Sequence, residues 1–311
     1  MLNIVLETSR YVVKNSKHVS IDYTKISDLI DELYKFNNVH YLSKVKYPIY
    51  DMDIKDLINF LLIYDSIDFS FWGNPKWENQ NGLDGGIGLL DCIFNLFKDK
   101  DSTEVIKYLS NITLNEFSNI LKGNIDIPLL NERYIIVKDI CTTVVNKMNG
   151  DFYNEIKDVR SDIELFNIIL TNFKSFADTR TYNGVEVHFY KLAQLLTSDI
   201  LHVYELKMGY AVDYSNLIGC ADYKIPQVLE SLGILKYDEE LNSIIESKTE
   251  IEENSIYEVE IRSSMLVVID YIYNTINKEI PRIDINDFIW SKGQDKTRVT
   301  KPYHLTRTTS Y

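Results

Sequence analysis

Apolar residues recur every three or four positions along most of this chain, which places them on one face of an α-helix. Two such runs follow a Ser/Thr-x-x-Glu capping signature, at Thr113 with Glu116 and at Ser161 with Glu164. A long stripe runs from Val187 to Tyr204. The same spacing predicts further helices over 21–36, 89–97, 225–232 and 258–276 and a helix start near Pro128.

Turn-forming residues are scarce. The chain has 12 Gly and 6 Pro among 311 residues. The combined share of Gly and Pro is therefore about 6%, below the roughly 12% that is usual in proteins. A many-stranded barrel or sandwich needs more turns than this supply supports. We therefore expect an all-α, multi-helix fold. No repeat or flexible linker divides the sequence, so we predict one domain over 1–311, built as one body or as two interlocked helical lobes with a soft division near residue 150.

Charge and cysteine content narrow the class of protein. The formal charge of −13 opposes the gripping of nucleic-acid backbones, so we expect no stable nucleic-acid complex. Three separated cysteines, no leader peptide and no apolar run of membrane-spanning length favour a cytoplasmic protein without membrane contact. Metal-ligand spacings, phosphate loops and nucleophile elbows are missing from the sequence, so we expect no metal and no cofactor.

Two polar residues stand out beside predicted helices. Pro226 at the first helical position would put the helix cap at Ile225 and leave Asp222 three residues upstream. Asp222 then either satisfies the helix N-terminus or is held ionised and aimed into a cleft. Lys191 shares the polar side of its helix with Gln194 and Ser198, and such a stripe usually faces solvent. If it lined a cleft instead, Lys191 and Asp222 would suit a sugar phosphate and a developing glycosyl cation.

An aromatic segment offers a second candidate. Phe69, Phe71 and Trp72 form either core or a stacking platform for a heterocycle, in keeping with 22 Tyr, 13 Phe and 3 Trp in the chain. Phe69 and Phe71 would point the same way only in an extended segment. Glu258, Glu260 and Arg262 begin a long apolar helix and are equally open to a structural role or a role in the site.

Several stretches together resemble the queuosine salvage protein family, the queuosine 5′-phosphate N-glycosylases. They span most of the chain in order: Phe69–Trp72, Ile127–Arg133, His188–Leu196, Ala221–Leu229, Leu232–Tyr237, Glu258–Arg262, and Pro302–His304 followed by Arg307 and Tyr311. One position departs from the family pattern, because Ser291 follows Trp290 where the family commonly has Asp. Asp295 or another carboxylate is then a candidate substitute.

The resemblance implies a helical fold like that of helix-hairpin-helix DNA glycosylases. It implies hydrolysis of the N-glycosidic bond of queuosine 5′-monophosphate, which releases queuine for tRNA modification and ribose 5-phosphate. Its catalytic aspartate falls on Asp222 and its important lysine on Lys191. The substrate-binding residues expected on this basis are Phe69, Phe71, Trp72, Tyr223, Asp68, Glu260, Arg262, Trp290 and Asp295.

The substrate's chemistry limits the mechanism. Queuine is a 7-deazaguanine, so a carbon replaces N7. The usual protonation of N7, which improves a purine as a leaving group, therefore cannot occur. We expect Asp222 to stabilise a ribosyl cation and Lys191 either to hold the 5′-phosphate or to tune Asp222. Carboxylates such as Asp65, Asp68 or Glu260 are candidates for the amine and diol of queuine. The alternatives are a nucleic-acid base glycosylase or binder on the same scaffold, and a non-catalytic helical interaction protein.

Overall fold

A computed structural model describes the chain at all residues except 1, 37–39, 45–46, 296 and 298. The described chain is mostly helical. Its α-helices are α1 (Asn3–Asn15), α2 (Ile26–Leu33), α3 (Ile54–Ser66), α4 (Gly85–Phe97), α5 (Ser102–Asn111), α6 (Leu114–Ile120), α7 (Leu130–Lys147), α8 (Tyr153–Ile156), α9 (Asp162–Asn172), α10 (Lys191–Met208), α11 (Lys224–Ser231), α12 (Glu239–Glu246), α13 (Ile256–Thr275) and α14 (Arg282–Lys292). Short 3-10 turns lie at Tyr23–Lys25, Tyr41–Lys44, Ile49–Asp51 and Lys174–Phe176.

Two small antiparallel strand pairs correct the all-α prediction. Strand β1 (Val19–Ile21) pairs with β4 (Leu235–Tyr237), and β2 (Thr179–Tyr182) pairs with β3 (Val185–His188). The predicted helix over 187–204 therefore starts too early, since Val187 lies in β3. Asn183 and Gly184 join β2 to β3 with φ of 50° and 78°, the positive values that a tight hairpin turn needs. That Asn-Gly pair was a sequence signal for the hairpin.

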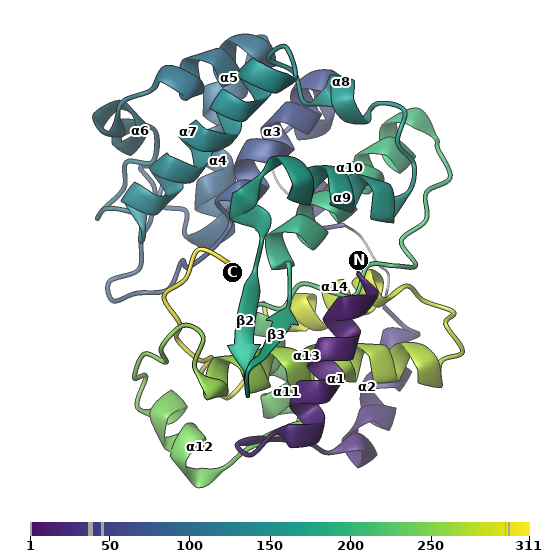
Figure 1. The fold of residues 1–311 in the computed structure, drawn as a ribbon. Coiled ribbons are helices and arrows are strands. Elements are labelled where there is room, and N and C mark those ends of the chain that lie inside the picture. Colours follow the sequence, from purple (N-terminus) through teal and green to yellow (C-terminus); the bar gives the residue numbers. More distant parts are fainter. Residues whose placement is uncertain (1, 37–39, 45–46, 296, 298) are drawn as a thin grey trace.

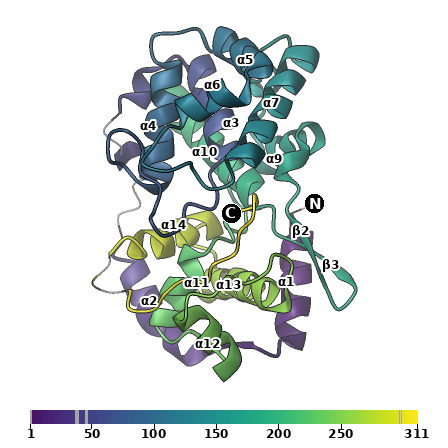
Figure 2. The same cartoon turned by 90° about the vertical axis from the view of Figure 1, so that its left-hand side faces the viewer.

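The helices form two groups that meet across the middle of the molecule (Figure 1). Helices α3 to α10 make up the upper group, while α1 and α2 join α11 to α14 in the lower group. Helix α1 packs on α13, and β1 on β4, so residues 2–33 lie with the C-terminal third of the chain. Figure 2 shows α14 at the junction of the groups. Buried apolar residues of both groups belong to one continuous core.

The predicted caps account for where several helices begin. Thr113 and Glu116 form the expected reciprocal capping box at α6, and the Ser161 side chain accepts a hydrogen bond from the backbone of Glu164 at α9. The division expected near residue 150 stays a prediction; that residue lies between α7 and α8, both in the upper group. In the described part of the chain, no helix is both long and apolar enough to cross a membrane.

Candidate functional site

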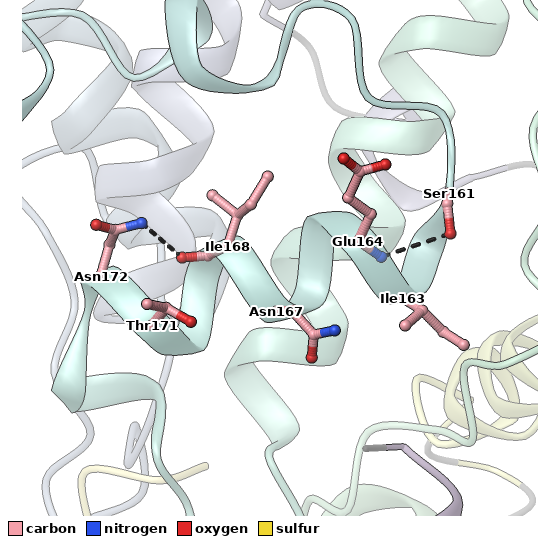
Figure 3. A pocket seen from close by; sticks show the side chains of 7 residues that line it. All are labelled: Ser161, Ile163, Glu164, Asn167, Ile168, Thr171 and Asn172. Carbon is pink, nitrogen blue, oxygen red and sulfur yellow. Dashed lines mark hydrogen bonds between the residues drawn. The ribbon is translucent and has the colours of Figure 1, made fainter.

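Two cavities are candidates for the functional site. The first, of about 420 Å³, lies along α9, and its lining residues all come from that helix and its N-cap (Figure 3). Side chains spread along one helix do not converge on a ligand. The second, of about 330 Å³, is lined by residues from both groups of helices. Polar and aromatic side chains converge only in the second cavity of these two, so we take it as the candidate site.

The second cavity collects most of the residues singled out in the sequence. Those brought together are Asp68, Phe69, Phe71, Trp72, Lys191, Asp222, Tyr223 and Trp290. Further aromatic side chains complete the wall: Phe36, Tyr41, Tyr64, Tyr303 and Tyr311. An aromatic cavity with a few charged groups suits a flat heterocycle that carries polar substituents.

Asp222 both caps a helix and faces the cavity. Its Oδ1 accepts hydrogen bonds from the backbone N–H groups of Lys224 at 2.9 Å and Ile225 at 3.0 Å. Helix α11 begins at Lys224, so the cap predicted at Ile225 was placed too late. Pro226 is still tolerated because the first N–H groups of a helix have no partner within it. Among the described residues, no hydrogen bond reaches Asp222 Oδ2, which leaves that oxygen for a ligand.

Lys191 opens α10 and is buried, with its side chain 7% exposed. Its Nζ donates to the backbone oxygen of Asp68 at 3.0 Å and to Asp68 Oδ2 at 3.2 Å. Gln194 and Ser198 are buried as well, so the solvated interpretation of this polar stripe was wrong. Its polar side is enclosed at the junction of the two groups, where Lys191 meets the cavity.

Neighbouring charges offset the effect of burial on the pKa values of Lys191 and Asp222. Burial lowers the pKa of Lys191, but Asp68 and Asp222 nearby raise it above the usual lysine value. Burial raises the pKa of Asp222, whereas the N–H of Ile225 and the charge of Lys191 act to lower it. Lys191 is therefore a buried ammonium between two carboxylates, and its charge favours the ionised form of Asp222.

Arg262 lies behind the site and positions both Lys191 and Asp222. Its guanidinium donates to the backbone oxygen of Ala221 at 2.9 Å and to both carboxylate oxygens of Asp178, at 3.0 and 2.5 Å. The same Asp178 accepts from the backbone N–H of Lys191 at 3.2 Å. Arg262 is fully buried and does not line the cavity, so the structure places it as a support and not beside a ligand.

Glu260 and Asp295 are likewise not brought to the cavity. Glu260 accepts hydrogen bonds from Ser16, from the backbone N–H groups of residues 17–19 and from Tyr182 Oη, and so fixes the turn into β1. Asp295 is exposed and accepts from Thr297. Ser291 stands where the family commonly has Asp. Unlike Glu260 and Asp295, it lines the cavity.

The aromatic segment is anchored from two sides. Arg133 of α7 lies 4.2 Å from the ring centre of Phe69 and 4.9 Å from that of Phe71, and it donates to the backbone oxygens of Ile67 and Phe69. Both rings therefore contact one guanidinium, although Ser70 between them has a left-handed φ of 44°. On the other side, Trp72 Nε1 donates to the Thr306 oxygen at 3.3 Å.

Asp287 is a cavity residue that the sequence analysis missed. It lies on α14, one turn before Ser291 and on the same helix face. Burial raises its pKa to about 6, with His40 acting in the opposite direction. The aspartate at i−4 from Ser291 was a usable signal, had 282–292 been predicted as a helix.

Among the described residues, no group of three or more His, Cys, Asp or Glu is placed to hold a metal ion.

Comparison with known proteins identifies the family of this chain. The family profile described as "Queuosine salvage protein" matches residues 49–311. A protein of Sphaerobacter thermophilus is 30% identical over alignments that cover 99% of this chain and 97% of its own length. Proteins of Dictyostelium discoideum (27%, covering 100% and 99%) and Bos taurus (28%, covering 98% and 98%) are also similar. All three are named queuosine 5′-phosphate N-glycosylase/hydrolase. The chain therefore belongs to the queuosine salvage protein family.

Proposed function

We propose that this protein hydrolyses the N-glycosidic bond of queuosine 5′-phosphate, the activity in the names of its relatives. One observation carries the proposal: a buried aspartate, Asp222, presents an oxygen with no described hydrogen-bond partner to an aromatic cavity next to a buried lysine. A carboxylate in that setting stabilises a developing sugar cation more strongly than it would in water.

The reaction breaks the bond between C1′ of the ribose and N9 of the base. The bonding electrons leave with the base, and C1′ gains positive charge that the Asp222 carboxylate faces. Water adds its oxygen to C1′ and keeps one proton as the new hydroxyl group, while its other proton goes to N9 of the departing base. The products are queuine and ribose 5-phosphate, which balances the atoms of the nucleotide and one water molecule.

Lys191 acts in this scheme by tuning Asp222. Its Nζ is already bonded twice to Asp68 and is buried, which leaves little room for a phosphate dianion. Its charge favours the ionised form of Asp222, the form that a ribosyl cation requires. Of the two roles expected for this lysine, tuning is the one these contacts support.

The proposal is tested with the purified protein and queuosine 5′-monophosphate, by following queuine and ribose 5-phosphate with mass spectrometry. Asp222→Asn should lower kcat by about 10²- to 10³-fold, because it removes a preorganised charge. Asparagine is as good a helix cap as aspartate, so the melting temperature should stay near that of the wild type. Wild-type turnover in a folded Asp222→Asn protein would exclude Asp222 as the catalytic carboxylate.

Finer assignments belong to the same proposal. We propose a single domain, a scaffold related to helix-hairpin-helix DNA glycosylases, a cytoplasmic location and no stable nucleic-acid complex. The charge of −13 supports the last of these. A gel-shift titration at low salt tests it, since retention of oligonucleotides would favour the nucleic-acid glycosylase or binder instead.

A further inference from the structure

One end of the cavity is built on buried carboxylates. Tyr41 and Tyr64 line it, and the Tyr41 hydroxyl donates to Asp199 Oδ2 at 2.5 Å. Asp199 is 1% exposed and lies on α10 two turns after Lys191, on the same helix face. Asp65 of α3 is fully buried, and neither of its carboxylate oxygens accepts a hydrogen bond from a described residue.

Two of these acidic groups are balanced from within the protein. Asp199 Oδ1 lies 3.1 Å from His40 Nε2, and the hydrogen bond and charge of Asp199 raise the pKa of His40 although burial lowers it. His40 stacks on His202, whose pKa falls to about 4 through burial. Burial, reinforced by Asp199 and Asp68, holds the pKa of Asp65 well above its ordinary value, which keeps that carboxyl neutral.

Asp287 differs from Asp199 and Asp65, because no described side chain pairs with its charge in the way that His40 pairs with Asp199. Among the described residues, its carboxylate accepts a hydrogen bond from the neighbouring Asn286 Nδ2 at 3.1 Å, a neutral donor. Its remaining charged neighbours are Asp199, Asp284 and His40, and His40 is already engaged by Asp199. Trp290, three residues later on α14, and Tyr41 line the same cavity, with ring centres 6.2 Å apart. A carboxylate and aromatic faces together favour an organic cation.

Positive side chains line the cavity further along α14. Gly293 packs against Lys224, whose Nζ lies 4.9 Å from the ring centre of Tyr303. Lys76 lines the same cavity and forms an ion pair with Asp84 at 3.7 Å. Six residues of helix separate Asp287 from Gly293, about 9 Å along the axis. Asp287 and the two lysines therefore lie at separate places in the lining of the cavity, so the cavity can receive the amine and the phosphate of one ligand at different places.

We propose that Asp287 binds the protonated secondary amine on the side chain of the base, and so determines specificity for queuosine over simpler 7-deazaguanosine nucleotides. This inference rests on the proposed function, because it assigns one part of that substrate to one residue. The phosphate then lies toward Lys76 and Lys224. Ser291, one turn later, offers no charge, so Asp287 supplies the carboxylate that α14 brings to the cavity.

The test compares two substrates with the same glycosidic bond, queuosine 5′-monophosphate and 7-deazaguanosine 5′-monophosphate, which lacks the whole side chain that carries the amine and the diol. Asp287→Asn should lower kcat/KM for the first by about 10- to 100-fold, mainly through KM, because a hydrogen bond to a charged group is lost. The same variant should change kcat/KM for the second substrate far less. Asp284→Asn, which removes an equal charge one turn away and outside the cavity, should leave the ratio of the two values as in the wild type.

A second measurement needs no variant. Calorimetric titration of the wild type with queuine and with 7-deazaguanine should show queuine bound at least 10-fold more tightly. Equal losses for both substrates in Asp287→Asn, or equal binding of the two bases, would overturn the assignment of Asp287. A wild-type protein that cleaves neither nucleotide would instead overturn the proposed function, and this inference with it.

Discussion

Three buried cations lie around the cavity, and their roles differ because their hydrogen-bond and ion-pair partners differ. Lys191 sits between Asp68 and Asp222 at the cavity wall. Arg262 holds Asp178 and the Ala221 backbone behind it. Arg133 bonds to backbone oxygens and covers two aromatic rings. A cation whose charge reaches the proposed catalytic carboxylate shifts the pKa of that group, while a cation surrounded by protein acceptors fixes geometry.

Lys191→Met separates the two roles expected for this lysine. Without the ammonium the pKa of Asp222 rises, since Lys191 lowers it in the wild type. We expect kcat/KM at neutral pH to fall about 10²-fold and the acid limb of its pH profile to move to higher pH. Lys191→Arg, which keeps the charge, should shift this limb less. An unchanged limb with a raised KM would indicate a phosphate contact instead.

At the scale of elements, helix starts place the two residues that we propose as catalytic. Lys191 is the first residue of α10, after Tyr190 with a left-handed φ of 54°. Asp222 stands two residues before α11 and caps it. The unpaired N–H groups of a helix start attract carboxylates, so Asp178 and Asp222 are both held by backbone of the helices they precede.

A helix cap away from the cavity provides an element-scale prediction. Thr113→Ala removes the side-chain half of the capping box of α6 and should cost about 1 kcal/mol of unfolding free energy. Urea denaturation measures this loss. Thr113→Ser keeps the hydroxyl and should retain most of the stability. Both variants should keep wild-type kcat, and a loss of activity greater than the loss of folded protein would contradict this separation of cap and site.

At the scale of the whole molecule, the C-terminal tail joins the two groups of helices. The backbone N–H of Ser70 donates to the Tyr311 oxygen at 2.9 Å, and that of Ile251 donates to the Leu305 oxygen at 2.7 Å. The tail thereby connects the aromatic segment above the cavity with the loop before α13 below it. Tyr311 is buried, lines the cavity and lies 4.2 Å under the Arg262 guanidinium.

His304 in this tail makes the stability of the molecule sensitive to acid. It is 2% exposed, and burial together with Arg262 lowers its pKa to about 3. The unfolded chain takes up this proton near pH 6.5 while the folded protein does not, so stability is lost as pH falls below that value. Between pH 7 and pH 5 this group should account for about 2 kcal/mol of lost unfolding free energy.

Urea denaturation of His304→Gln at the two pH values checks this prediction. The variant should lose about 2 kcal/mol less than the wild type between pH 7 and pH 5. From pH 7 to pH 8 the two proteins should change in parallel, because His304 is then neutral in both states. Equal losses on acidification would mean that His304 is protonated within the fold.

The sequence by itself determined the features that depend on residues a few positions apart. The capping signatures at Thr113 and Ser161 are confirmed, and the helices over 89–97, 225–232 and 258–276 match observed helices with shifted ends. The family match confirms the resemblance carried by the ordered motifs. The Asn183-Gly184 hairpin was within reach of the same local reasoning and was missed.

The tertiary structure decided which polar residues meet. Periodicity shows that Lys191, Gln194 and Ser198 share a face, yet only packing between the helix groups buries that face. Glu260 and Arg262 differ little in sequence from site residues, but α13 directs them to the β1 turn and to Asp178. Asp287 reaches the cavity because α14 lies at the junction of the groups. Local sequence sets which side chains share a face, whereas burial depends on distant segments that pack against it.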